Sequence, residues 1–285
     1  MHAHTEQDTV GDRRRRRLVA PIAAGLALTL GLAACGDSDE DATTTTTEAD
    51  TPSTTAAGAT GDVSAFCDAA FDVDATFAAS GPEGPDPARL EAVFEKAKAT
   101  APAEISDDVD RISELTQQAF AAGGEEEHGP PPPEVQEIDG RIDDYLLANC
   151  EVAEVAVTGT EYKFEGLDEP LEVGKTAFNF TNEGGEEHEL ILLRFNDGVT
   201  QSLEELAQLP PEEAFTKVEA KGFAMAPPGG SDLAFVDLEP GRYGALCFFT
   251  VGSTPEALAA AKESGQEIDG PPHFTQGMLA EFTVE

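Results

Sequence analysis

The stretch Pro272-His273-Phe274-Thr275-Gln276-Gly277-Met278, near the end of the 285-residue chain, decides how the last third of the sequence folds and what it holds. It places a histidine and a methionine five positions apart, directly before the closing run Leu279 to Val284. Upstream the chain offers His188 and Cys247, so the order of donors is His, Cys, His, Met. Two imidazoles, a thiolate and a weak thioether form a donor set that suits copper. The leading hypothesis is therefore one copper ion held by these four side chains.

The region around this stretch has the pattern of a β-protein. From residue 151 onward the apolar residues alternate with a period of two, and Gly, Pro and Asn bound the apolar segments. The segments that we expect to form strands are 152–157, 162–164, 176–181, 189–195, 232–238, 243–249 and 280–284. Seven short strands in about 135 residues predict a β-sandwich. Two insertions, Ser202 to Val218 and Pro255 to Gly265, are expected to be helical.

Three motifs in this region resemble those of the cupredoxins, such as plastocyanin and halocyanin. Phe180 to Leu190 is similar to the strand and loop that deliver the first histidine of that family. Pro240 to Cys247 resembles its Gly-x-Tyr-x-x-x-Cys strand, and His273 to Met278 reproduces its His-x4-Met. The resemblance covers about residues 152–285 and implies a cupredoxin-like Greek-key β-sandwich.

The same resemblance implies a type 1 copper site. His188, Cys247 and His273 would be the strong ligands and Met278 the long axial one. Both histidines must be neutral to coordinate, which an ordinary pKa near 6.5 permits, and copper would hold the cysteine as a thiolate. With all four positions taken by the protein, no position stays open for a substrate, so we expect one-electron transfer and no enzyme activity.

Three phenylalanines next to the ligands carry a further expectation. Phe248, Phe249 and Phe274 flank the cysteine and the second histidine in the sequence. We expect their rings to keep water away from the metal, which would raise its reduction potential by disfavouring the more charged oxidised state.

The sequence departs from the common family pattern in one spacing. In the family the cysteine and the second histidine lie a few residues apart, whereas 25 residues separate Cys247 from His273 here. Loop-closure entropy grows slowly with length, so a loop of 25 residues costs only about 1.6 kcal/mol more than a loop of four. We therefore expect the chain to leave the site and return to it.

Residues 63–150 have a helical period instead. Apolar residues recur at steps of three and four in four stretches separated by prolines, which predicts a four-helix bundle. Cys67 near its start and Cys150 at its end would fall at the same end of an up-down-up-down bundle. We expect a disulfide between them, which would add roughly 4 kcal/mol of stability by closing a loop of about 80 residues.

The first 34 residues have the pattern of a secretory signal, because Arg13 to Arg17 precede the short apolar run Leu18 to Ala34. The sequence Leu32-Ala33-Ala34-Cys35-Gly36 resembles the lipobox of bacterial lipoproteins. That resemblance implies a diacylglyceryl group on Cys35, cleavage before this residue, an acyl chain of the palmitate type on the new N-terminus, and a position on the extracytoplasmic face of the cell membrane. The alternative is a soluble secreted protein in which Cys35 is incidental.

Residues 35–62 are rich in Thr, Ala and Asp and cannot bury enough apolar surface to fold, so they are expected to be a disordered tether. The expected order is therefore signal peptide 1–34, tether 35–62, helical bundle 63–150 and β-sandwich 151–285. This is an α + β chain with its helices and strands in separate domains.

The net charge of −39 argues against nucleic acid or anionic lipid as a partner of the folded part. It favours a basic redox partner or a setting of high salt, although a solvated acidic surface explains it equally well. His128, in an acidic loop before a run of prolines, is interpreted as a solvated loop residue rather than a ligand.

Two other functions stay open. The sandwich can be a copper-free binding module that displays the acidic loops Glu183 to Glu187 and Glu212-Glu213, with Cys247 simply buried. The same four ligands can instead serve copper storage or delivery, in which metal rather than electrons is passed on.

Overall fold

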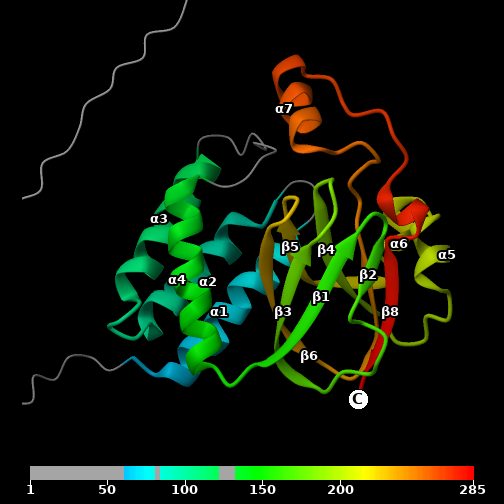
Figure 1. The fold of residues 1–285 in the computed structure, drawn as a ribbon. Coiled ribbons are helices and arrows are strands. Elements are labelled where there is room, and N and C mark those ends of the chain that lie inside the picture. Colours follow the sequence, from blue (N-terminus) through cyan, green and yellow to red (C-terminus); the bar gives the residue numbers. More distant parts are fainter. Residues whose placement is uncertain (1–60, 81–83, 122–131) are drawn as a thin grey trace, which may run out of the picture. The chain divides into compact units, whose positions relative to one another are not determined.

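The computed structural model describes residues 61–80, 84–121 and 132–285 (Figure 1). The expected signal peptide, the lipidation site Cys35, almost all of the tether and His128 lie outside the described residues. Among the helices of the described part, none is both long and apolar enough to cross a lipid bilayer.

Four helices come first, as the periodicity predicts: α1 (Val63–Ala78), α2 (Pro87–Thr100), α3 (Ser106–Ala121) and α4 (Pro133–Asn149). Asp62 and Asp86 cap α1 and α2 by accepting hydrogen bonds from backbone N–H groups of the first turn. Cys67 of α1 and Cys150, the residue after α4, form the expected disulfide, with their Cα atoms 5.6 Å apart.

The helices pack on the strands that follow them. The ring of Phe71 in α1 meets the ring of Phe235 edge to face at 5.6 Å, and Lys175 forms an ion pair of 2.7 Å with Asp68. Buried residues of the helices and of two strands thus share one apolar cluster. An independent four-helix bundle, in a domain separate from the sandwich, stays a prediction.

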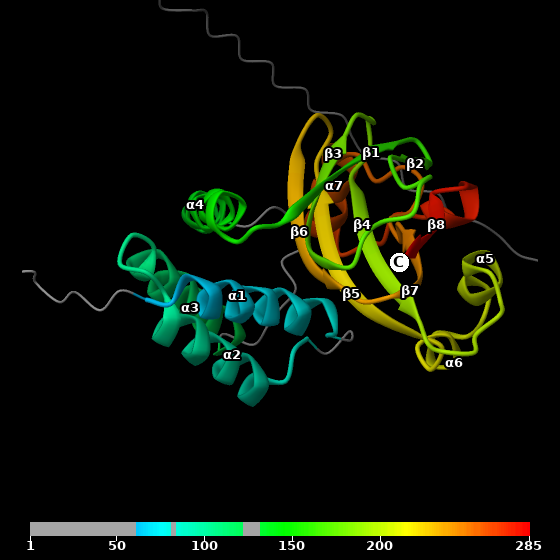
Figure 2. The same cartoon turned by 90° about the horizontal axis from the view of Figure 1, so that it is seen from below.

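In the part of the chain that the structure describes, eight strands form two sheets that lie face to face (Figures 1 and 2). The first sheet has the order β2-β1-β3-β6 and the second β5-β4-β7-β8. Only β1 and β3 pair in parallel among these neighbours. The strands are β1 (Ala153–Thr160), β2 (Lys163–Glu165), β3 (Gly174–Asn182), β4 (His188–Phe195), β5 (Val218–Ala226), β6 (Ser231–Leu238), β7 (Gly241–Leu246) and β8 (Leu279–Val284).

The structure corrects the sequence-based assignment around β5. The predicted helix at 202–218 is two short helices, α5 (Leu203–Ala207) and α6 (Pro211–Ala214), and its last residue begins β5, a strand that the sequence did not predict. Strand β5 contains one β-branched residue and a central glycine, so its own propensity is weak. Antiparallel pairing with β4 along its length determines its conformation. The second insertion is helical as expected, as α7 (Pro255–Ser264).

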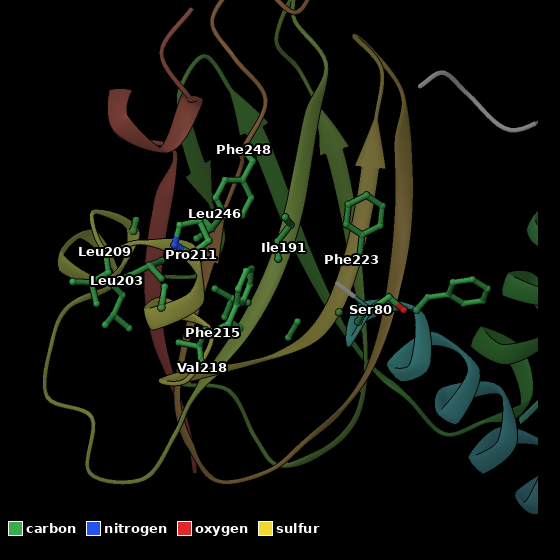
Figure 3. A pocket seen from close by; sticks show the side chains of 18 residues that line it. Ser80, Ile191, Leu203, Leu209, Pro211, Phe215, Val218, Phe223, Leu246 and Phe248 are labelled. Atoms are coloured by element: carbon green, nitrogen blue, oxygen red, sulfur yellow. The ribbon is translucent and has the colours of Figure 1, made fainter. Parts of the chain in front are cut away.

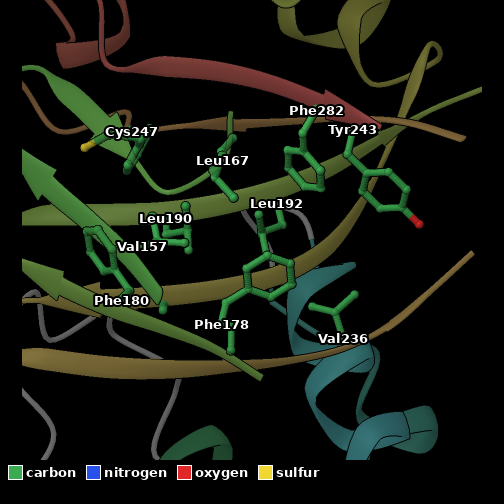
Figure 4. Close-up of a cluster of buried hydrophobic side chains, with 14 of the residues drawn as sticks. Val157, Leu167, Phe178, Phe180, Leu190, Leu192, Val236, Tyr243, Cys247 and Phe282 are labelled. Atoms are coloured by element: carbon green, nitrogen blue, oxygen red, sulfur yellow. The ribbon is translucent and has the colours of Figure 1, made fainter. Parts of the chain in front are cut away.

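The buried core of the sandwich extends as far as the candidate site (Figure 4). Phe178 and Phe180 of β3 and Leu190 and Leu192 of β4 point from opposite sheets into one buried cluster. Alternate residues of a strand face the same side. Because the two residues named on each strand are two positions apart, both point inward, and they identify the inner face of that strand. Cys247, the residue after β7, belongs to the same cluster.

Candidate metal centre

Three of the four expected ligands meet in one place. The ligand atoms of His188, Cys247 and His273 all lie within 4.8 Å of one another, and all three side chains are fully buried. His273 Nδ1 is 3.2 Å from His188 Nδ1 and 3.4 Å from Cys247 Sγ. The same ring nitrogen of each histidine therefore faces the other, and the sulfur lies beside them. Metal–nitrogen bonds near 2.1 Å and metal–sulfur bonds near 2.3 Å, which are typical values, need only a small closure of this triangle.

Backbone hydrogen bonds close the 25-residue excursion between two of these ligands. His273 N–H donates to Phe249 O (2.7 Å) and Phe274 N–H to Cys247 O (3.0 Å). One step further out, Val251 N–H donates to Pro271 O at 2.9 Å. These hydrogen bonds hold the two ends of the loop side by side. We call this paired segment, residues 247–251 and 271–274, the neck, and α7 lies beyond it (Figure 1).

Each of the two histidines is also positioned by its local backbone. His188 is the first residue of β4, where it pairs with Ala226 of β5. His273 begins a short 3-10 helix, His273–Gln276, that follows Pro272, and Gly277 ends this helix with a φ of 114°. A positive φ is easily adopted by glycine alone, so Gly277 sets the turn that leads into Met278.

Burial and the second imidazole lower the pKa of His188 to about 4. The ring is therefore neutral at ordinary pH, as metal binding requires. Its Nε2 is buried and has no hydrogen-bond partner within the described residues. Burial, followed by the charge of Glu189, raises the pKa of the Cys247 thiol to about 12. Without a metal the sulfur is thus a neutral thiol, and a bound cation would displace its proton.

Met278 is positioned by backbone hydrogen bonds to two of the other expected ligands. Its side chain is fully buried in the core cluster that contains Cys247. Its N–H donates to His273 O at 3.1 Å, and its carbonyl accepts from Cys247 N–H at 3.3 Å. The fourth expected ligand is therefore tied through the backbone to two of the other three.

A carboxylate contacts the outer edge of His273. Glu186 Oε2 lies 3.0 Å from His273 Nε2 and accepts a 2.8 Å hydrogen bond from Gly252 N–H. Glu186 Oε1 accepts from the Tyr162 hydroxyl at 3.2 Å. Burial alone would raise the pKa of Glu186, but these three hydrogen bonds together hold it below its usual value. The sequence interpretation assigned the acidic run at 183–187 a role only in the alternative of a binding module, as a loop displayed to a partner or divalent cation, so this inward-facing member was missed.

Asn182 holds the loop that carries Glu186 and His188. Its amide nitrogen donates to Glu186 O (2.8 Å) and to Ala226 O (2.7 Å), and its amide oxygen accepts from Gly184 N–H (2.8 Å). The residue is fully buried at the end of β3. No sequence motif identified it, because Asn182-Glu183-Gly184-Gly185 has the composition of any turn.

A second carboxylate orders the chain beyond the cysteine. Glu189 Oε1 accepts a 2.7 Å hydrogen bond from Phe248 N–H, and its own N–H points at Cys247 Sγ from 3.5 Å. Burial raises the pKa of this carboxyl to about 7. The sulfur and the backbone directly after Cys247 are thus both contacted by the residue that follows the first histidine.

Of the three phenylalanine rings that we expected to keep water away from the metal, the ring of Phe248 does not do so. Phe248 is 46% exposed and lines an apolar groove of about 270 Å³ on the outer face of the second sheet (Figure 3). Phe77, Phe215 and Phe223 line it as well and are 38%, 58% and 46% exposed. Phe249 packs partly buried on the main core, and Phe274 meets Phe248 edge to face at 5.4 Å. The prediction was wrong for Phe248, because successive residues of an extended chain point to opposite faces.

The donor set fits one type 1 copper ion. Two imidazoles, a thiol and a neighbouring thioether gather in a buried space, and the cupredoxin resemblance of the sequence is confirmed by this His–Cys–His cluster. The acidic run thereby divides into Glu186, which faces the site, and Glu183, which is exposed.

Comparisons with known proteins give likenesses of structure only. No family model matches the chain, and no curated protein matches it. Among solved structures, the chain is similar to a reduced auracyanin from Roseiflexus castenholzii, with 19% identity over 47% of this chain and 97% of that one and a TM-score of 0.30. Auracyanin A of Chloroflexus aurantiacus, described as a "blue" copper protein, is 14% identical over 47% of this chain and 98% of its own, with a TM-score of 0.29. A multi-copper oxidase from Pediococcus acidilactici is 14% identical over 47% of this chain and 26% of its own, with a TM-score of 0.24.

Proposed function

We propose that the chain is a copper protein that passes single electrons through one type 1 site formed by His188, Cys247, His273 and Met278. The observation that carries the proposal is the buried triangle of two imidazole nitrogens and one sulfur, within 4.8 Å of one another. Copper supplies a one-electron couple when bound. The four side chains leave no free position for a substrate, which favours a carrier rather than an enzyme.

The residues of the chain would do three things for such a couple. They hold the two imidazoles facing each other and keep the ring of His188 neutral, they exclude water, and they fix the backbone directly after Cys247. Because Glu189, Asn182 and the loop neck restrain the ligands, little movement is needed when the charge at the centre changes by one. Small reorganisation is what fast electron transfer requires.

The electron route that we propose runs through Phe248. The imidazole of His273 is fully buried, so its ring edge does not reach the surface. Phe248 follows Cys247 in the chain, and its ring is half-exposed in the apolar groove. A partner with an apolar contact face and a basic rim would match this groove and the net charge of −39. Its association rate should fall as salt is added.

Titration with copper(II) tests the proposal directly. The expected result is one equivalent bound, with a strong visible absorption from thiolate-to-copper charge transfer that is lost in Cys247→Ser. Cys67 and Cys150 form a disulfide and cannot substitute for this sulfur. An absence of the absorption in the folded protein, or the same spectrum in Cys247→Ser, would refute the copper site.

The same titration separates the alternatives. A copper-free binding module predicts a metal content at background in both the wild type and His188→Ala. A storage or delivery protein predicts very tight copper(I) binding and transfer of the ion to a chelator or acceptor protein. An electron carrier instead keeps its ion and exchanges electrons with a redox dye.

We further propose that the protein is anchored by lipid at Cys35 on the extracytoplasmic face of the membrane. The support is the lipobox-like sequence after an arginine-rich, apolar start. Growth with labelled palmitate should label the wild type and leave Cys35→Ala unlabelled and released from the membrane fraction. Label on the variant would contradict the proposal.

A further inference from the structure

The ring of His273 is held on both of its edges. On one edge Nδ1 faces Cys247 Sγ and His188 Nδ1, at 3.4 and 3.2 Å. On the other edge Nε2 lies 3.0 Å from Glu186 Oε2. The Tyr162 ring lies against its face, with ring centres 4.8 Å apart. Such enclosure leaves the ring one orientation.

The contact with Glu186 decides which nitrogen carries the proton. A neutral imidazole has one N–H, and an ionised carboxylate can only accept a hydrogen bond. The proton must therefore be on Nε2, pointing at Glu186, and the lone pair on Nδ1 points at the sulfur and at His188. A metal ligand needs that lone pair, so Glu186 prepares His273 for coordination before any ion is present.

We propose that Glu186 is a positioning residue of the copper site, which fixes the Nε2–H tautomer of His273 and biases the bound ion toward copper(II). This inference rests on the proposed copper function. The bias follows from charge, since a carboxylate one imidazole away from the ion stabilises the oxidised state, which carries one more positive charge. The effect opposes the rise in potential expected from apolar shielding.

Glu186 is itself held at three of its atoms. Gly252 N–H donates to Oε2, the Tyr162 hydroxyl donates to Oε1, and the backbone carbonyl of Glu186 accepts from Asn182. Gly252 belongs to the long loop between Cys247 and His273, and its φ of 96° favours glycine. The loop therefore does more than reconnect two ligands, because it also supplies a donor that aims the carboxylate at His273.

The tautomer can be tested without copper. In the metal-free wild type, nitrogen NMR of the histidine side chains should show a neutral His273 protonated at Nε2. Glu186→Gln keeps a carbonyl oxygen as acceptor and should keep this tautomer, whereas Glu186→Ala should give a mixture or the Nδ1–H form. A wild-type His273 protonated at Nδ1 would overturn the inference. This readout is independent of whether the chain binds copper at all.

The charge effect is tested on the copper-loaded protein. Glu186→Gln should raise the ratio of copper(I) to copper(II) affinity about tenfold, which for a one-electron couple is about 59 mV in potential. Glu186→Ala should also weaken copper(II) binding about 10 to 100-fold. Glu183→Gln is the matched control, since it removes the same charge from an exposed residue of the same loop.

The outcomes separate the two proposals. Equal potentials in Glu186→Gln and Glu183→Gln would refute the electrostatic part, even if the copper site is real. Failure of the wild type to bind copper would refute the proposed function, while the tautomer result would still decide whether Glu186 positions the ring.

Discussion

Cys247 Sγ and His273 Nδ1 lie 3.4 Å apart although 25 residues separate them in the sequence. The neck of backbone hydrogen bonds brings them together, from Phe274 N–H to Cys247 O inside and from Val251 N–H to Pro271 O outside. The chain beyond the neck includes α7, which has no buried residue. The length of the loop therefore does not determine the geometry of the ligands at its two ends.

Replacing residues 255–268 with a short Gly-Ser turn should leave the copper absorption unchanged. The shortened loop keeps Gly252, Ser253 and the neck, and loop closure becomes slightly easier, by less than about 1 kcal/mol. Copper titration of the shortened chain measures this. Loss of the absorption in a folded, shortened protein would mean that α7 itself shapes the site.

The neck itself should be intolerant of substitution. A Cβ atom on Gly270 would come within 2.4 Å of the Val251 carbonyl oxygen, which is backbone and cannot move aside cheaply. Gly270→Ala is therefore expected to weaken copper binding, in contrast to the excision of the whole helix. Unchanged copper affinity in Gly270→Ala would contradict the role of the neck.

Asn182→Ala should destabilise the protein and weaken copper binding together. The substitution removes one buried and two partly buried hydrogen bonds, and a fully buried group left unsatisfied costs about 1 to 3 kcal/mol. Asn179→Ala is the control, because Asn179 is exposed on the same strand. Urea unfolding and copper titration of both variants measure the difference, and equal effects would argue against Asn182 as the support of the ligand loop.

Removing the disulfide should affect stability and leave the metal centre unchanged. Cys67 and Cys150 are 83 residues apart in the sequence, and the chain-entropy model assigns such a loop about 4 kcal/mol. Both cysteines lie in the cluster formed by the helices, whereas the ligands lie in the core of the sandwich. We expect Cys67→Ser/Cys150→Ser to unfold at lower urea and to show the wild-type copper spectrum. A changed spectrum would show that the helices constrain the site.

How far the sequence predicts the site depends on how local each signal is. His273 and Met278 share one short motif and Cys247 ends a recognisable strand, so pattern alone identified them. Glu186 belongs to an acidic run in which nothing distinguishes it from Glu183, and only the fold turns one inward. Strand β5 was missed for a similar reason, since its conformation comes from pairing with β4 rather than from its own residues.

Stability should fall as the pH rises from about 4 to about 8. Burial, followed by repulsion from neighbouring carboxylates, raises the pKa of Asp143 to about 8 and that of Asp74 to about 7, with Asp139 and Asp232 among the neighbours. Between the ordinary and the raised pKa the folded state binds more protons than the unfolded state. Folding is then favoured at low pH, and each such carboxyl costs up to about 1.4 kcal/mol per pH unit as the pH rises.

Urea unfolding at about pH 5 and pH 8 tests this dependence. Asp143→Asn should reduce the difference between the two conditions, because the amide does not titrate. Asp110→Asn removes the same charge from an exposed position of α3 and controls for the overall acidity of the chain. If both variants flatten the pH dependence equally, general repulsion and not the buried carboxylates is responsible.

Met278→Leu should keep the visible absorption and change the reduction potential. Leucine has nearly the volume of methionine, so the buried position should cost less than about 1.5 kcal/mol in folding. Only the thioether is lost, and the axial ligand of a type 1 site tunes the potential while the two imidazoles and the thiolate determine the colour. Met225→Leu, on strand β5, makes the same chemical change at a methionine that is not an expected ligand. Voltammetry of both variants decides the role: a shift confined to Met278→Leu supports axial ligation, and equal potentials would make Met278 a residue of the core alone.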